Sequence, residues 1–238
     1  IEVFIDKEPI TVICSEKGWI KAAKGHLTDV TEVKYKDGDR EKFFFHAETT
    51  DKILLFATNG RFYTIPCNKL PGGRGFGEPV RLMIDLGNEH EIVGLFLFRT
   101  KESFLLASNA GRGFIVKSDD VLAQTKNGKR VLNLQGADEA IAVCRVEGNY
   151  VAVIGNNRKL LLFSLDEVPE MNRGRGVIFQ RYKDGGLADV KTFDFKEGLS
   201  WKTGDRTRTE TTLTDWKGKR GQAGRLAPKG FAKVNRFS

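Results

Sequence analysis

Short apolar runs separated by polar turns recur along the whole chain. The clearest runs are residues 53–56, 104–107, 151–154 and 199–202, and a shorter copy begins with residues 10–14. Each run is followed by a turn signal such as Asn59-Gly60 or Gly204-Asp205. Apolar runs of this length bounded by Gly, Asn and Asp are typical of buried β-strands. The pattern predicts an all-β chain, with single helical turns only at residues 119–124 and 166–170.

Every copy of the strand-turn-strand unit leads into a loop rich in glycine and basic residues. The loops are Lys24-Gly25-His26, Gly72-Gly73-Arg74-Gly75, Lys126-Asn127-Gly128-Lys129-Arg130, Arg173-Gly174-Arg175-Gly176 and Lys217-Gly218-Lys219-Arg220-Gly221. Repetition of short strands at a period of about 40–50 residues indicates a propeller-like architecture. We therefore expect one β domain over residues 1–238 with five repeats, at 1–48, 49–100, 101–147, 148–196 and 197–238.

The net charge of the chain indicates a class of binding partner. The chain has 39 Lys and Arg against 31 Asp and Glu, a formal net charge of +8, and a pI near 9.4. Residues 200–238 hold ten of the basic residues and three of the acidic ones, a net charge of +7. A basic excess of this kind favours a polyanionic partner. Because this end continues the repeat and contains Trp201, Trp216 and Phe231, we expect it to be folded.

The compartment is indicated by the cysteines and by the ends of the chain. Cys14, Cys67 and Cys144 are odd in number and lie in or beside apolar runs, which favours free thiols in a reducing cytosol. The N-terminus has no signal-peptide pattern, and the apolar runs are far shorter than the ~18 residues that span a bilayer. We expect a cytoplasmic protein without a membrane partner. The chain opens within a strand-like stretch at Ile1-Glu2-Val3-Phe4, so we also expect it to be part of a longer protein.

The sequence offers little for catalysis or metal binding. Gly73-Arg74-Gly75-Phe76-Gly77 has the glycines of a nucleotide loop, but Glu78-Pro79 follows where that mechanism needs a helix N-terminus. His26, His46 and His90 are far apart in the sequence and lack a Cys or carboxylate partner at metal spacing, so we interpret them as surface or packing residues. No acid/base pair or activated nucleophile is evident. We predict no catalytic, metal or cofactor site in this chain.

The basic loops are the candidate functional site. Scattered Lys and Arg usually form only a solvated surface, but their recurrence at equivalent places of consecutive repeats favours a belt that follows phosphates. Glycine beside them has no Cβ and lets the backbone approach a phosphate closely. Binding of this kind is strongly dependent on salt. Since no helix is available to enter a major groove, we expect selectivity from DNA shape and bendability rather than from base contacts.

Several motifs resemble a known family. They are Glu8-Pro9-Ile10-Thr11-Val12, Gly18-Trp19-Ile20-Lys21, Asn59-Gly60-Arg61-Phe62-Tyr63, Leu70-Pro71, the stretch from Ala107 through Gly111-Arg112-Gly113-Phe114, and Val168-Pro169. Together they resemble the C-terminal domain of bacterial type IIA topoisomerase A subunits over essentially the whole chain. Within that family the chain is more similar to topoisomerase IV A subunits than to gyrase A subunits. The first repeat lacks the Gln-Arg-Arg-Gly-Gly-Lys-Gly box of gyrase, and we count five repeats where gyrase typically has six.

The resemblance implies a five-bladed β-pinwheel, a propeller-like fold whose blades exchange strands, with a basic rim that binds and bends duplex DNA. It implies that the catalytic tyrosine, the ATPase, ATP and Mg belong to other parts of the enzyme. The implied partners are duplex DNA, the ATPase B subunit, and the N-terminal breakage-reunion part of the same polypeptide, on the bacterial chromosome. Relaxation and decatenation are expected rather than wrapping for supercoiling. Two alternatives stay open, a gyrase A domain that wraps DNA and a propeller that serves as a protein-interaction scaffold.

Thirteen basic residues are the predicted rim, neutralising phosphates without reading bases. They are Lys21, Lys24, Arg61, Arg74, Arg112, Lys129, Arg130, Arg173, Arg175, Lys217, Lys219, Arg220 and Arg225. The motif from Lys217 to Gly224 resembles the gyrase box but lies in the last repeat, and Arg158 occupies a turn where the other copies have Gly. These two departures distinguish the chain from the family pattern.

Overall fold

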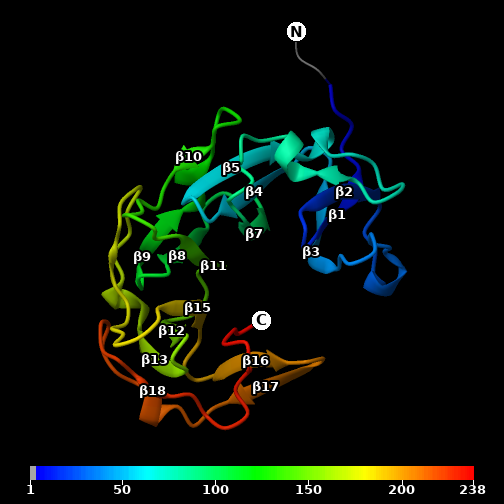
Figure 1. Cartoon of the computed structure of the whole chain (residues 1–238). Helices are drawn as coiled ribbons and strands as arrows, with labels where there is room; N and C mark the ends of the chain where they lie inside the picture. The colour runs from blue at the N-terminus through cyan, green and yellow to red at the C-terminus, as the bar shows by residue number, and fades with distance from the viewer. Residues whose placement is uncertain (1–3) are drawn as a thin grey trace. The chain divides into compact units, whose positions relative to one another are not determined.

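The computed structural model describes residues 4–238 and is built from β-strands and single 3-10 turns (Figure 1). The first three residues of the strand-like stretch expected at the N-terminus lie outside this range. The chain divides into two compact units. The first comprises Ile1–Ala57, Phe62–Arg99 and Leu122–Lys129, and the second comprises Thr58–Arg61, Thr100–Val121 and Arg130–Ser238. The all-β prediction is therefore confirmed, whereas the single-domain boundaries stay a prediction.

The first unit contains the first two repeats. One four-stranded sheet has the order β3 (Glu41–Glu48), β1 (Pro9–Ser15), β2 (Trp19–Lys24), β6 (Glu78–Pro79). The next has the order β10 (Lys129–Arg130), β5 (Arg61–Pro66), β4 (Lys52–Ala57), β7 (Ile92–Leu97). The central strands β1 and β4 are buried beyond their first residues, and with the inner faces of β2 and β5 they form one apolar core, to which Val12, Ile20, Leu55 and Tyr63 belong.

The second unit contains the other three repeats. Its four-stranded sheets have the orders β11 (Ala140–Arg145), β8 (Ser103–Ser108), β9 (Arg112–Lys117), β14 (Val177–Ile178) and β15 (Leu187–Phe193), β12 (Tyr150–Gly155), β13 (Lys159–Ser164), β18 (Arg225–Leu226). The fifth is a two-stranded ribbon of β16 (Leu199–Thr203) and β17 (Arg206–Glu210). Phe231 packs on Trp201 of this ribbon and Phe237 packs on Phe231, so the basic C-terminal end is folded as expected.

The fourth strand of each four-stranded sheet is donated by the following repeat. The donated strands β6, β10, β14 and β18 are two residues long and lie beside β2, β5, β9 and β13. This exchange is the defining feature of a pinwheel, and it confirms the five-bladed fold inferred from the resemblance. Each donated strand follows a crossover segment that begins with a 3-10 turn. These turns are η2 (Cys67–Lys69), η4 (Ser118–Val121), η5 (Leu165–Glu167) and η6 (Thr214–Trp216).

Two further 3-10 turns, η1 (Val30–Glu32) and η3 (Val80–Leu82), lie in the first unit. Within residues 4–238 every helical segment has three or four residues, and none approaches the length or the apolar character of a membrane-spanning helix. The two helical turns expected from the sequence correspond to η4 and η5, although both are shorter than predicted.

Arg158 replaces glycine in the tight turn between β12 and β13. Its φ is +65°, in the left-handed region that Gly60 and Gly111 occupy in the equivalent turns at +78° and +82°. The guanidinium donates hydrogen bonds to the Ala232 carbonyl at 3.0 Å and to Asn235 Oδ1 at 3.0 Å. These bonds fasten the C-terminal segment to the blade, so the strained turn residue has a structural role in this unit.

The three cysteines are free, and Cys14 and Cys67 are buried in the core of the first unit. Burial raises the pKa of both thiols to about 12. Ionisation at neutral pH is therefore strongly suppressed, and these thiols pack as small apolar groups.

A glycine immediately precedes each donated strand, at a point where two backbones touch. Each of the four has a positive φ, and a Cβ there would lie 2.0–2.7 Å from the carbonyl oxygen of the second residue of the neighbouring strand. The pairs are Gly77 with Ile20, Gly128 with Phe62, Gly176 with Gly113 and Gly224 with Leu160. No side chain can be accommodated at these positions unless the donated strand moves away. Strand exchange in this chain therefore depends on glycine.

Replacing Gly224 by alanine should destabilise the second unit far more than replacing Gly221. Both have a positive φ, which costs alanine roughly 1–2 kcal/mol. Only Gly224 would also place a Cβ 2.5 Å from a carbonyl oxygen, whereas the nearest atom to a Cβ at Gly221 is 3.9 Å away. We expect Gly224→Ala to lower the free energy of unfolding by about 2–4 kcal/mol in urea titrations followed by tryptophan fluorescence. Equal losses for the two variants would contradict this account of strand exchange.

Candidate nucleic-acid interface

Most of the thirteen predicted rim residues lie on the crossover segments or on the donated strands. Nine belong to this group: Arg74, Lys129, Arg130, Arg173, Arg175, Lys217, Lys219, Arg220 and Arg225. All of these are exposed or partly exposed, and Arg220 is half-buried. The other four, Lys21, Lys24, Arg61 and Arg112, lie on the strands β2, β5 and β9 that receive the donated strands. Four of the five basic loops of the sequence are thus the connections through which consecutive repeats exchange strands, whereas Lys24-Gly25-His26 connects β2 to β3 within the first repeat.

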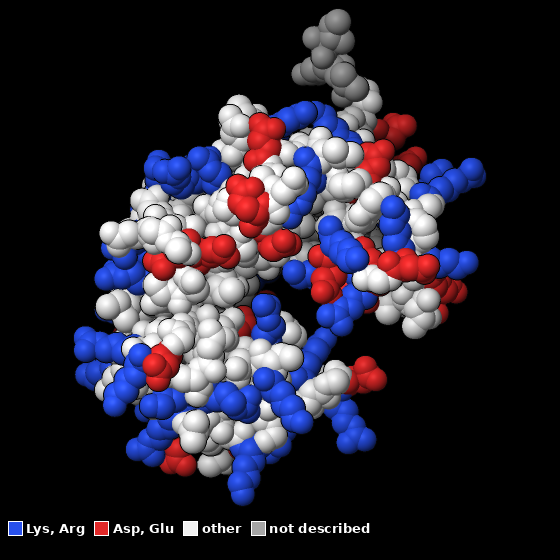
Figure 2. Space-filling model, in the orientation of Figure 1, with Lys and Arg blue, Asp and Glu red and all other residues white. Residues whose placement is uncertain are grey.

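The second unit carries the denser positive charge. Figure 2 shows Lys and Arg spread over the surface around β12, β13, β16 and β18 with few acidic side chains between them. Over the strands of the first unit, basic and acidic residues are interspersed. This contrast follows the sequence, in which residues 200–238 carry a net charge of +7.

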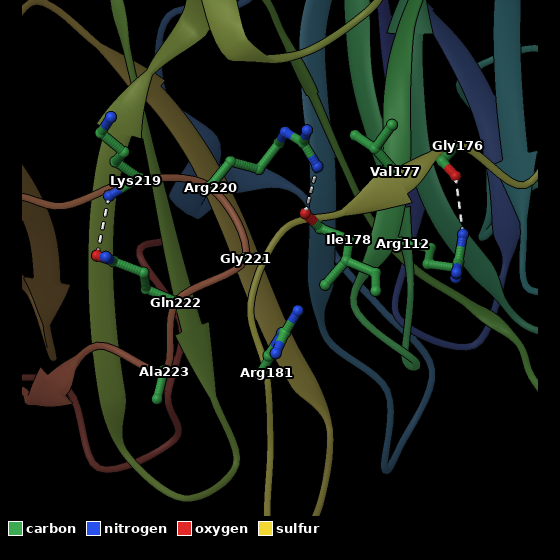
Figure 3. A pocket seen from close by; sticks show the side chains of 10 residues that line it. All are labelled: Arg112, Gly176, Val177, Ile178, Arg181, Lys219, Arg220, Gly221, Gln222 and Ala223. Carbon is green, nitrogen blue, oxygen red and sulfur yellow. Dashed lines mark hydrogen bonds between the residues drawn. The ribbon is translucent and has the colours of Figure 1, made fainter.

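A cavity of about 780 Å³ in the second unit brings four cations together (Figure 3). Its walls come from the start of β9, the donated strand β14 with the residues after it, and the crossover that leads to β18. Arg112, Arg181, Lys219 and Arg220 line it, and none of the ten lining residues is acidic. A concave surface whose charged residues are all cations is suited to an anionic ligand.

Two of these cations hold the cavity wall in place. Arg112 Nη1 donates to the Gly176 carbonyl at 3.1 Å, and Arg220 Nη1 donates to the Ile178 carbonyl at 2.9 Å. Both carbonyls belong to β14 or to the residue before it, as the dashed lines in Figure 3 show. These two arginines anchor the exchanged strand.

The other two cations of the cavity have side chains without a bonding partner in the described part of the chain. Among residues 4–238, the side chains of Arg181 and Lys219 make no hydrogen bond or ion pair. Their main chains are fixed instead, because Lys219 N donates to Gln222 Oε1 at 3.0 Å and Arg181 N donates to the Gln222 carbonyl at 3.2 Å. A rigid backbone that carries unpaired cations is a suitable arrangement for contacting phosphates.

Several predicted rim residues have structural contacts of their own. Lys21 is only 7% exposed, and its Nζ donates to the Gly75 carbonyl at 2.9 Å, so it holds the basic loop of the first unit. Burial also lowers the pKa of the Lys21 ammonium. In the second unit, Arg173 Nε donates to Asn133 Oδ1 at 3.3 Å, and Lys217 Nζ lies 5.0 Å from the centre of the Phe195 ring. Direct contact of these residues with DNA stays a prediction.

The sequence interpretation missed Arg181 and a structural role of some loop glycines. Arg181 follows the donated strand rather than preceding it, and it lies outside the glycine-rich motif on which the prediction relied. Two glycines of the basic loops, Gly128 and Gly176, are required by contact with the neighbouring strand. The phosphate argument remains a prediction for Gly72 and Gly75, where a Cβ would meet nothing within 4 Å.

Two of the histidines lie together, which their separation in the sequence did not indicate. His26 and His46, distant in the sequence, stack with ring centres 4.4 Å apart, and their Nε2 atoms approach the Ala47 and Leu27 carbonyls. They are packing residues, but they lie together. In the part of the chain that the structure describes, no group of three His, Cys, Asp or Glu residues could hold a metal ion.

Residues 51–99, 102–144 and 149–188 match the family model described as DNA gyrase C-terminal domain, beta-propeller. The chain belongs to this family. The match assigns it to the C-terminal domain of a type IIA topoisomerase rather than to the catalytic domain, as the resemblance implied. The DNA topoisomerase 4 A subunit of Rickettsia bellii is 46% identical over 238 residues, and that of Caulobacter vibrioides is 47% identical over 239 residues. Both alignments include the whole of this chain but only 32% and 31% of the relatives.

Solved structures agree with this assignment. The C-terminal domain of E. coli ParC superposes with a TM-score of 0.80 at 25% identity, covering 95% of this chain and 96% of that one. The C-terminal domain of DNA gyrase A has a TM-score of 0.66 at 18% identity, covering 96% of this chain and 80% of that one, and shows the fold alone. The expected similarity to topoisomerase IV A subunits is confirmed, and the chain spans about a third of the length of these relatives.

Arg220 and Lys219 are neighbours with different expected roles. Arg220→Ala removes the bond to the Ile178 carbonyl and should lower the free energy of unfolding by about 1.5–3 kcal/mol, as is usual for a hydrogen bond from a charged donor. Lys219→Ala removes an exposed side chain without a partner and should change the free energy of unfolding by less than about 0.5 kcal/mol. Urea unfolding of the two variants tests this. A stability loss for Lys219→Ala that equals the loss for Arg220→Ala would refute the division into anchoring and free cations.

Proposed function

We propose that this chain binds and bends duplex DNA through a basic rim formed by its crossover segments and guides the choice of DNA segment by a topoisomerase IV. The proposed partners are the ATPase B subunit and the catalytic part of the polypeptide to which this domain belongs. Relaxation and decatenation of the bacterial chromosome are the proposed outcome. The observation that carries the proposal is the cavity in the second unit, where four cations converge and none of the ten lining residues is acidic.

The placement of the other cations supports the same function. Arg173, Arg175 and Arg225 are solvent-accessible residues on or next to the segments that cross between repeats of the second unit. Phosphate contacts from such positions fix the path of a duplex but carry no sequence information. The described residues contain no helix that could enter a major groove, because the 3-10 turns span three or four residues. Recognition would therefore depend on the shape and deformability of the DNA.

Bending explains why many cations are needed. Curving a site of 20–30 bp by 40–90° costs on the order of 1–6 kcal/mol, so several phosphate contacts must act together. Removal of single charges should therefore weaken binding gradually.

Removing four crossover cations should reduce both the affinity and its salt dependence. In the variant Arg173→Gln, Arg175→Gln, Lys219→Gln and Arg225→Gln, the loss of four phosphate contacts lowers the slope of log K against log salt by about 3.6, at about 0.9 per phosphate. Fluorescence anisotropy with a short duplex across a salt series measures this slope. The matched control replaces four lysines outside the crossovers, Lys7, Lys34, Lys117 and Lys196, by glutamine. It should keep nearly the parental slope.

The same titrations distinguish a rim that guides DNA from a merely basic surface. Bent or crossed duplex should bind more tightly than linear duplex of equal length. Heparin should compete poorly with the duplex when both are present at the same concentration of negative charge. Unchanged affinity in the four-charge variant would refute the proposal. Equal and weak binding of every polyanion would instead favour a protein-interaction scaffold.

A further inference from the structure

The outer edge of β5 differs from the equivalent edge of the other exchanged sheets. In β2, β9 and β13 the fourth residue forms a parallel bridge with the crossover: Ala22 with Gly72, Ile115 with Glu170, and Leu162 with Lys217. The Ala22 and Ile115 amides donate to the Pro71 and Pro169 carbonyls at 2.8 and 3.0 Å, and the Leu162 carbonyl accepts from Gly218 N at 2.8 Å. Three crossovers therefore cover the strand edge beside them.

Thr64, the fourth residue of β5, has no such bridge in the described residues. Its hydroxyl accepts a hydrogen bond from Ala123 N at 2.9 Å. Ala123 occupies the place of Pro71 and Pro169 after the 3-10 turn, and unlike proline it has an N–H that the hydroxyl can bind. Thr64 pairs with Leu54 as Ala22 pairs with Val12, so its own amide and carbonyl point away from β4 towards the open edge.

A cleft of about 470 Å³ lies at this edge, wholly within the first unit. Thr64 lines it together with the apolar side chains of Leu82 and Met83, and Leu82 is 69% exposed. Lys52, Lys69 and Lys126 also line the cleft, no acidic residue does, and these lysines have no ion pair among residues 4–238. The cleft thus combines an unpaired strand edge, an apolar patch and three cations.

We propose that this cleft docks an extended acidic segment of a partner protein, which pairs its backbone with Thr64. Peptides that add to a sheet edge bind through main-chain hydrogen bonds and place alternate side chains in pockets. An apolar side chain would cover Leu82 and Met83, while flanking carboxylates would face the three lysines. The inference goes beyond DNA binding, because a phosphate backbone has neither amide groups to pair with a strand edge nor an apolar side chain to cover an apolar patch.

The chain itself contains a segment of the required chemistry. Residues 165–170, Leu-Asp-Glu-Val-Pro-Glu, form the crossover that pairs with Ile115 through the Pro169 carbonyl. A synthetic peptide of this sequence is therefore the probe. A matched peptide with Asn and Gln in place of Asp and Glu tests the carboxylates.

The experiment is a titration of the ¹⁵N-labelled chain with each peptide, followed by NMR. The acidic peptide should shift the Thr64 amide saturably, and the neutral peptide should bind more weakly. The double variant Leu82→Ala, Lys69→Glu should weaken binding by about fivefold or more, because it loses an apolar contact and reverses a rim charge. The control Leu226→Ala, Lys34→Glu changes a leucine of the same 69% exposure and another lysine outside the cleft, and it should bind like the parent.

Three results would overturn the proposal. The first is the absence of a saturable Thr64 shift up to about 1 mM peptide, which corresponds to a binding free energy of only about −4 kcal/mol. The second is equal binding by the double variant and its control. The third is a Thr64 shift caused by duplex DNA, or by raising the concentration of the chain alone, which would assign the cleft to DNA or to a second copy of the chain.

Discussion

The contact between each donated strand and the strand that receives it is the constraint on which the structure depends. Two backbones meet at Gly77, Gly128, Gly176 and Gly224, so closely that a Cβ would collide with a carbonyl oxygen. The donated strand can then complete a sheet with only two residues. The chain enters that short strand from a crossover segment whose basic residues are mostly exposed, and it leaves the strand into the core, where Val80, Val131 and Phe179 are buried. The crossovers that close the sheets thus also present basic residues to solvent.

The cations at these connections have two different roles. Lys21, Arg112 and Arg220 bind backbone carbonyls and hold the crossovers in place. Arg181 and Lys219 extend from a backbone that is already fixed. Because ordering of long side chains and loops opposes binding, a preorganised backbone reduces the free-energy cost of contacting DNA. The anchoring cations therefore support the free ones, even where they touch no phosphate themselves.

The sequence predicted the repeated features of the fold and missed those set by contacts between repeats. The long strands were predictable because runs such as residues 151–154 are apolar and are bounded by turn residues. Strands such as Glu78–Pro79 and Val177–Ile178 were not, since two residues have no periodicity. Arg158 was recognised as a departure from glycine, and its bonds to residues 231–235 show what stabilises that departure. The stacking of His26 on His46 depends on the pairing of β1 with both β2 and β3, which their sequence separation conceals.

The central claim, that crossover cations contact the DNA, is tested most directly by lysine footprinting. The chain is acetylated with and without saturating duplex, and each lysine is quantified by mass spectrometry. The account predicts that DNA protects Lys129, Lys217 and Lys219 and leaves Lys7, Lys34 and Lys196 as reactive as before. Equal protection of all six lysines, or protection of only Lys7, Lys34 and Lys196, would contradict the account.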